Sequence, residues 1–141
     1  MGRKIVLVSH NGLAEGVLGA ATMICGQNDE LCAFGLAPDG SVAELGKKVR
    51  ALAEAHAEDQ VIVLADLLGG SVCNQCLEEL AGLKNVKIVA GLSLPLLLAI
   101  AGRDGELSDE EIDGAVAEAT GMTKRVELDL DAAPDTEEDF F

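Results

Sequence analysis

The chain has 141 residues, the usual size of one domain, and 49% of them are hydrophobic, which is enough to form a core. Its formal net charge of −15 disfavours binding to nucleic acid or to anionic membranes and suits a basic protein partner better. No signal peptide is evident, and the longest apolar stretch, around residues 94–101, is far too short to span a bilayer. We therefore expect a cytoplasmic protein that does not insert into membranes.

The first half of the chain alternates short apolar runs with helical spacing. Residues 4–8 predict a buried strand, residues 13–25 a helix and residues 31–36 a second short strand. Ser41 and Glu44 have the spacing of a capping box, which predicts a helix that ends near residue 57.

The second half continues this alternation. It predicts a third strand at residues 61–65, a helix that Ser71 caps and that ends near residue 80, and a fourth strand at residues 86–90. Pro95 suits the first position of a helix that ends near residue 101, because its missing N–H costs nothing there. Ser108 and Glu111 predict another capping box, with a helix to about residue 120.

The C-terminal part has a different pattern. Residues 124–130 alternate charged and apolar side chains, which predicts a half-exposed edge strand. Residues 131–141 are acidic and poor in structure-forming residues, which predicts a disordered tail. We therefore assign one domain to residues 1–130 and a tail to residues 131–141.

Four wholly apolar strands separated by helices predict an α/β fold. The expected architecture is a three-layer sandwich with a mainly parallel, doubly wound sheet and a C-terminal edge strand. Functional groups in such folds gather at the carboxyl ends of the strands, where the strand order reverses. If the first and third strands are neighbours, His10 and Asp66 face each other at that edge.

A histidine beside a carboxylate has a clear chemical use. The carboxylate of Asp66 would fix the tautomer of His10 and leave the other ring nitrogen free as a base, a metal ligand or a nucleophile. Gly69, Gly70 and Ser71 follow Asp66 closely, and glycines before a helix start favour an anion. A nucleophilic nitrogen beside an anion site indicates phosphoryl transfer through a phosphohistidine.

Simpler interpretations of these residues stay open. His10 could be a solvated loop residue, Asp66 could cap a turn, and the two glycines could form a tight connection. His56 is expected to be a solvated surface residue.

The cysteine pattern also has two interpretations. Cys73 and Cys76 form a C-x-x-C, but the other cysteines lack the spacing that would complete a zinc site, so no metal and no other cofactor is expected. Core packing is the expected role of these thiols, with a redox pair as the alternative.

Three segments resemble the EIIA component of the mannose-type sugar phosphotransferase system. They are residues 5–16, which begin with a strand and His10, residues 66–71, which contain Asp66 and Gly-Gly-Ser, and residues 90–95. The resemblance covers about residues 3–130, with the segments in the family's order and spacing. The chain departs from the family at Asn11, where glycine is usual, and at Val72, Ser93 and Leu96.

The resemblance implies a function. His10 would accept a phosphoryl group from the phosphocarrier HPr and pass it to a cognate EIIB, which phosphorylates a sugar during uptake. Asp66 would orient His10, and Gly70 and Ser71 would line the phosphoryl site beside Gly69. The resemblance also implies the strand order 2-1-3-4, a homodimer in which the last, antiparallel edge strand is exchanged, and an EIIB on a separate chain.

Two further functions remain open from the sequence. A related fold with a similar first strand and histidine serves as the phosphoryl-transfer subunit of a phosphoenolpyruvate-dependent dihydroxyacetone kinase. A regulatory module could instead use phosphorylation of His10 as a switch. The transported sugar is not encoded in this chain, because EIIA does not contact it.

Overall fold

The computed structural model describes residues 2–128. Strands and helices alternate as the sequence predicts, and a fifth helix follows the fourth directly. The elements are β1 (Arg3–His10), α1 (Leu13–Cys25), β2 (Leu31–Leu36), α2 (Val42–Ala55), β3 (Gln60–Ala65), α3 (Ser71–Leu80), β4 (Val86–Ala90), α4 (Leu94–Ala101) and α5 (Asp109–Gly121). No helix in this part of the chain is long and apolar enough to cross a membrane.

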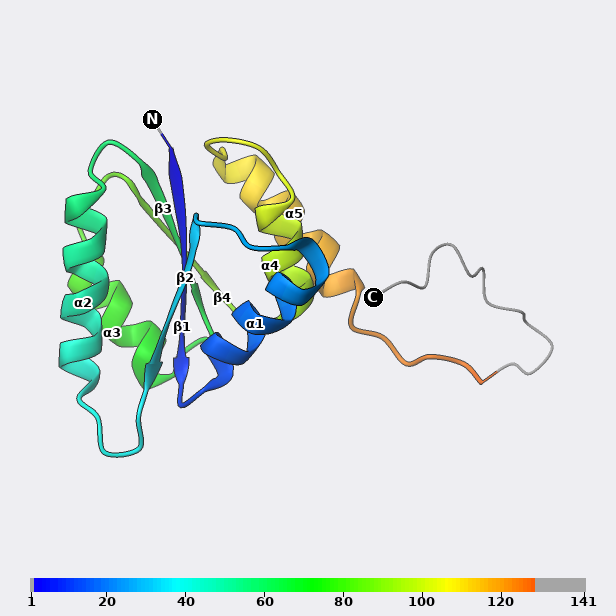
Figure 1. The fold of residues 1–141 in the computed structure, drawn as a ribbon, viewed down its shortest axis with the longest axis horizontal. Helices are drawn as coiled ribbons and strands as arrows, with labels where there is room; N and C mark the ends of the chain where they lie inside the picture. The colour runs from blue at the N-terminus through cyan, green and yellow to red at the C-terminus, as the bar shows by residue number, and fades with distance from the viewer. Residues whose placement is uncertain (1, 129–141) are drawn as a thin grey trace.

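The four strands form one parallel sheet in the order β2-β1-β3-β4, which confirms the predicted topology. Helices α2 and α3 cover one face, while α1, α4 and α5 cover the other, so the molecule has three layers (Figure 1). The chain leaves β1 toward β2 on one side and later returns to β3 on the other side. The order therefore reverses between β1 and β3, and Val8 of β1 pairs with Ala65 at the end of β3.

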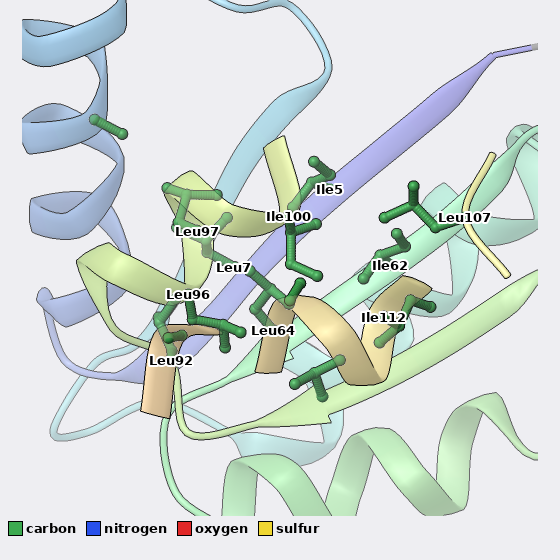
Figure 2. Close-up of a cluster of buried hydrophobic side chains, with 14 of the residues drawn as sticks. Ile5, Leu7, Ile62, Leu64, Leu92, Leu96, Leu97, Ile100, Leu107 and Ile112 are labelled. Atoms are coloured by element: carbon green, nitrogen blue, oxygen red, sulfur yellow. The ribbon is translucent and has the colours of Figure 1, made fainter. Parts of the chain in front are cut away.

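The central strands β1 and β3 are apolar at residues 5–8 and 61–65, because both faces of the sheet are buried there. Ile5, Leu7, Ile62 and Leu64 point toward α1, α4 and α5, and Figure 2 shows them packed against leucines of α4. The residues between them in β1 and β3 point to the opposite face and pack on α2 and α3. Two cores thus hold β1 and β3 rigidly in the centre of the sheet, where the site residues begin.

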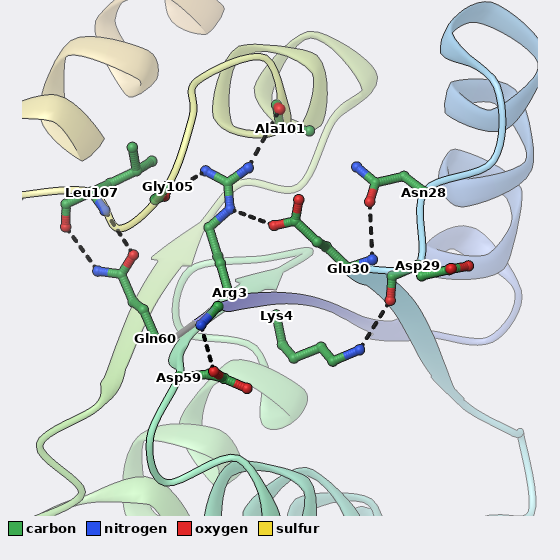
Figure 3. A network of polar contacts seen from close by, with 11 residues as sticks. Arg3, Lys4, Asn28, Asp29, Glu30, Asp59, Gln60, Ala101, Gly105 and Leu107 are labelled. Carbon is green, nitrogen blue, oxygen red and sulfur yellow. Dashed lines mark hydrogen bonds and ion pairs between the residues drawn. The ribbon is translucent and has the colours of Figure 1, made fainter.

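Polar contacts fasten the α4–α5 connection to the opposite, amino end of the sheet (Figure 3). The buried guanidinium of Arg3 donates to the carbonyl of Gly105 at 3.0 Å and to Glu30 at 2.9 Å. Gln60 makes two hydrogen bonds of 2.8 Å with the backbone of Leu107. These bonds satisfy the buried polar side chains at the amino end of the sheet.

The helix starts depart in detail from the expected caps. Ser108 and Glu111 form a complete capping box. Ser41 accepts from the Glu44 N–H, but the return bond from the Glu44 side chain is absent among the hydrogen bonds of residues 2–128. Pro95 occupies the second helical position of α4 rather than the first, because Ser93 is the N-cap.

The C-terminal predictions are only partly covered. Residues 123–128 are described and carry no strand assignment, although Val126 and Leu128 are highly exposed. An edge strand needs a neighbouring strand, and within residues 2–128 this segment has none. Residues 129 and 130 of the predicted strand, the domain boundary after residue 130 and the tail at 131–141 lie outside the described residues.

A close backbone contact shapes the turn between β1 and α1. Gly35 in β2 lies so near this turn that a Cβ at position 35 would overlap the carbonyl oxygen of Asn11. The Asn11 N–H donates to the Leu36 carbonyl at 2.7 Å, which holds the two segments together. Only glycine at position 35 permits this approach.

We expect Gly35→Ala to lower the free energy of unfolding by about 1–3 kcal/mol, because backbone atoms must move to admit the methyl group. The matched control is Gly19→Ala in α1, where nothing lies within 4 Å of a new Cβ. This control should be more stable than the wild type by about 0.5–1 kcal/mol, since alanine favours a helix. Urea unfolding of the three proteins checks both signs, and a Gly35→Ala protein as stable as the control would contradict the contact.

Candidate active site at the carboxyl edge of the sheet

His10 and Asp66 meet at the reversal point of the sheet, as the sequence predicts. His10 is the last residue of β1, and Asp66 directly follows β3, the neighbouring strand. The ring Nδ1 lies 2.8 Å from Asp66 Oδ2, and the backbone N–H of His10 donates to the same oxygen at 2.8 Å. The His10 side chain is 46% exposed, whereas that of Asp66 is 8% exposed. The carboxylate is thus fixed below a ring that incoming proteins can reach.

The electrostatics of this pair define the tautomer of His10. Burial raises the pKa of Asp66. The hydrogen bonds from the backbone and ring of His10, together with the charge of His10, lower this pKa by more, so it lies below its ordinary value. An ionised carboxylate only accepts hydrogen bonds, so Nδ1 carries the proton. In the neutral ring Nε2 therefore has a free lone pair.

Asp66 retains one unused acceptor. Its Oδ1 is the only buried side-chain nitrogen or oxygen without a hydrogen-bond partner among residues 2–128. All the bonding of the carboxylate therefore goes through Oδ2 to His10, and this indicates that orienting the histidine is the main role of Asp66.

Ser71 faces the free ring nitrogen. Its Oγ lies 3.2 Å from His10 Nε2, and with Nδ1 protonated the hydroxyl is the donor. The prediction that Ser71 caps α3 was wrong, because Gly70 is the N-cap and Ser71 is the first helical residue. A glycine in the cap position leaves the serine hydroxyl free to contact the ring.

The two glycines before Ser71 have separate reasons to be glycine. Gly69 has φ +81°, the left-handed region that other residues rarely adopt. A Cβ on Gly70 would lie 3.2 Å from the carbonyl oxygen of Leu67 and 3.3 Å from its Cβ, so glycine relieves crowding in the turn beside the His10 ring. The first N–H groups of a helix have no partner within it, so the start of α3 beside the ring suits an anion.

Asn11 explains one departure from the resembled family. It has φ +49° and is the only residue other than glycine with positive φ among residues 2–128. Asparagine tolerates the left-handed region better than most residues, so it can replace the usual glycine without changing the turn. Sequence reasoning missed this constraint, although the asparagine followed by Gly12 is a turn signal.

The third segment, residues 90–95, lies at the same edge but does not bond to His10. The N–H groups of Gly91 and Leu92 both donate to the Ala65 carbonyl at 2.8 Å. Ser93 caps α4 by accepting from the Leu96 N–H. This segment therefore supports the end of β3, next to Asp66.

The second histidine, His56, lies at the surface with its side chain 34% exposed, and it also contacts an aspartate. His56 follows α2, and its Nδ1 lies 3.1 Å from Oδ2 of Asp59, whose Oδ1 accepts from the N–H of Gly2. These hydrogen bonds hold the pKa of Asp59 below its ordinary value, with the Gly2 bond as the largest cause. His56 and Asp59 lie near the amino end of β3, away from the glycine loop. They form a natural comparison for the His10–Asp66 pair.

The C-x-x-C motif is part of the core. Cys73 and Cys76 are buried free thiols that pack between α3 and the sheet. Burial, and to a lesser extent Cys73, raises the pKa of Cys76 to about 11, which disfavours the reactive thiolate. This supports the packing interpretation over a redox pair. No group of three or more His, Cys, Asp or Glu side chains within residues 2–128 is placed to hold a metal.

Comparisons with known proteins agree on one family. The family model EIIA-man, described as the PTS system fructose IIA component, matches residues 4–117. The chain is 24% identical over 107 residues to the PTS system sorbose-specific EIIA component of Klebsiella pneumoniae, which covers 76% of this chain and 78% of that protein. It is 29% identical over 119 residues to the PTS system mannose-specific EIIAB component of Escherichia coli K12, covering 83% of this chain and 36% of that longer protein.

Solved structures give the same result. The mannose/sorbose specific IIA subunit of the phosphotransferase system from Enterococcus faecalis has a TM-score of 0.82 at 25% identity, covering 92% of this chain and 98% of that one. The PTS IIA protein associated with the fucose utilization operon of Streptococcus pneumoniae has a TM-score of 0.75 at 29% identity, covering 88% and 93%.

The lowered pKa of Asp66 predicts a pH effect on stability. A carboxyl whose folded pKa is depressed adds stability above its unfolded pKa of about 3.9, and that contribution is lost as the pH falls through the folded value. Asp66→Asn removes this group, so we expect its free energy of unfolding to fall less steeply below about pH 4 than that of the wild type. Unfolding in urea between neutral pH and about pH 3 measures the difference. Parallel curves for the two proteins would show that Asp66 is not preferentially ionised in the folded state.

Proposed function

The chain belongs to the EIIA-man family of phosphotransferase system proteins, and we propose that it accepts a phosphoryl group from HPr on Nε2 of His10 and passes it to a cognate EIIB. The family implies a phosphocarrier role in sugar uptake. One observation carries the finer proposal: an exposed histidine ring whose Nδ1 bonds to the Asp66 carboxylate, so that Nε2 is the free nucleophile. We expect such a protein to act in the cytoplasm, as the sequence predicts.

The proposed step is a direct displacement at phosphorus. The lone pair of His10 Nε2 attacks, a phosphorus–nitrogen bond forms, and the bond between phosphorus and the donor protein breaks with its electron pair leaving on the donor. Ser71 Oγ now donates to Nε2, so this hydroxyl must turn away before the attack. It is then positioned to donate to an oxygen of the transferred group.

Asp66 stabilises the product of this step. A ring that keeps its Nδ1 proton and gains phosphorus on Nε2 carries positive charge. The carboxylate 2.8 Å from Nδ1 offsets that charge, and its burial strengthens the interaction. The phosphoryl oxygens carry negative charge and would lie beside Gly70, Ser71 and the start of α3. The N-terminus of a helix favours anions.

We also propose that the protein is a homodimer through its C-terminal segment. Val126 and Leu128 are exposed apolar residues at period-two spacing, and β4 is an edge strand with one unpaired side within residues 2–128. Pairing of residues 124–130 with a second copy would bury both features.

The other two functions use the same histidine. A subunit of dihydroxyacetone kinase would pass phosphate to a kinase-bound nucleotide, and a regulatory module would pass it to nothing. The relatives reported above are sugar phosphotransferase components, which favours transfer to an EIIB.

Incubation with Enzyme I, HPr and labelled phosphoenolpyruvate tests the proposal. We expect acid-labile, base-stable label on the wild type, its complete loss in His10→Ala, and normal labelling of His56→Ala. The second variant is a matched control because His56 also bonds to an aspartate but lies away from the glycine loop. An unlabelled wild type, or label that survives in His10→Ala, would reject the assignment. Label that moves to ADP on the kinase, or to no acceptor, would support the alternatives.

Sedimentation at low micromolar concentration tests the dimer. We expect the wild type to sediment at twice the monomer mass of 14.6 kDa and Val126→Asp with Leu128→Asp to sediment as a monomer. The control is Leu77→Asp, which places a charge on a partly exposed apolar position of α3. A monomeric wild type, or a dimer in the double variant, would contradict the proposed interface.

A further inference from the structure

Ser9, the residue before His10, has a hydroxyl that is entirely buried. Its side chain is 0% exposed, although it lies at the carboxyl end of β1 beside an exposed histidine. Serine is seldom fully buried, and a buried hydroxyl must find hydrogen-bond partners. The mechanism proposed above does not use this residue.

The hydroxyl of Ser9 caps the start of α1. The N–H of Ala14, another fully buried residue, donates to Ser9 Oγ at 2.7 Å. Gly12 is the N-cap of α1 and has no side chain that could accept this bond. Ser9 therefore supplies from the strand the cap that the helix itself lacks.

The same hydroxyl also donates a hydrogen bond to the backbone of Asn11, two residues along the chain. Ser9 Oγ lies 3.3 Å from the carbonyl oxygen of Asn11. Asn11 is in the left-handed region, its N–H donates to Leu36, and its carbonyl lies against the Cα of Gly35. Three neighbours thus hold a backbone conformation that is otherwise unfavourable for a residue other than glycine.

His10 lies between these bonds and Asp66. On one side Asp66 Oδ2 accepts from the backbone N–H and from Nδ1 of His10. On the other side the direction of the Cα–Cβ bond depends on the backbone of residues 9–11. Both bonds to one carboxylate oxygen can form only if this backbone keeps its direction.

We propose that Ser9 is a positioning residue for phosphoryl transfer, because its hydroxyl fixes the turn that aims the His10 ring at Asp66. This inference rests on the proposed function for its kinetic consequence, but the ring geometry itself can be observed without any phosphoryl donor. Without the hydroxyl, the Ala14 N–H loses its acceptor and the turn after His10 loosens.

The experiment compares Ser9→Ala with the wild type in two measurements. The rate of label transfer from phosphorylated HPr is measured at rising HPr concentration, and the His10 ring is followed by proton–nitrogen NMR of the unphosphorylated protein. Ser108→Ala is the control, because it removes a helix cap of the same kind at the other end of the molecule. Ser9→Cys keeps the shape of the side chain with a slightly larger sulfur atom and weakens both hydrogen bonds, and it replaces Ser9→Ala if that variant does not fold.

We expect Ser9→Ala to transfer about tenfold more slowly at saturating HPr, with an unchanged half-saturating concentration, because misalignment affects the step rather than the docking. The Nδ1–H signal of His10 should broaden or disappear in this variant and remain in Ser108→Ala. Wild-type His10 signals in Ser9→Ala would overturn the proposal, as would a loss of rate that Ser108→Ala shares. If the wild type accepts no phosphate, the proposed function fails, while the His10 signals still decide the role of Ser9.

Discussion

Asp66 Oδ2 accepts two hydrogen bonds from one residue, the backbone N–H and the ring Nδ1 of His10, each at 2.8 Å. The backbone bond lies just beyond the last paired residues of β1 and β3 and extends their pairing through the Asp66 side chain. The sheet itself therefore positions the carboxylate. The ring bond then fixes the protonated nitrogen and leaves Nε2 free. A carboxylate that is nearly buried, beside a ring that is nearly half exposed, separates the orienting group from the reacting group.

The remainder of the fold keeps this pair in register. The apolar central residues of β1 and β3 place a core on each face of the sheet, and polar contacts of Arg3 and Gln60 tie the α4–α5 connection to its amino end. The carboxyl end is left to short turns, where Gly35 and Gly70 allow close approaches and Gly69 adopts a positive φ. The site is thus formed by loops on a rigid scaffold, which suits a histidine that we propose reacts with two different proteins in turn.

The sequence was sufficient to predict the parallel sheet, the positions of its four strands and of the five helices, and the meeting of His10 with Asp66, because continuous apolar runs and capping residues report directly on burial and helix starts. The edge strand predicted at residues 124–130 carries no strand assignment within the described residues. The sequence was also not sufficient at positions where two roles compete. Ser71 has the features of a cap, but Gly70 takes that place and frees the hydroxyl for the ring. The buried hydrogen bonds of Ser9 and the His56–Asp59 pair form where turns bring parts of the backbone together. The spacing of apolar residues in the sequence carries no information about such contacts.

The claim that Asp66 selects Nε2 as the phosphoryl acceptor has one most direct test. Phosphorus–nitrogen coupling in the NMR spectrum of the phosphorylated, nitrogen-labelled protein identifies which nitrogen carries the phosphoryl group. The account predicts phosphorus on Nε2 of His10, with Nδ1 still protonated and bonded to Asp66. Phosphorus on Nδ1, or on any residue other than His10, would contradict it.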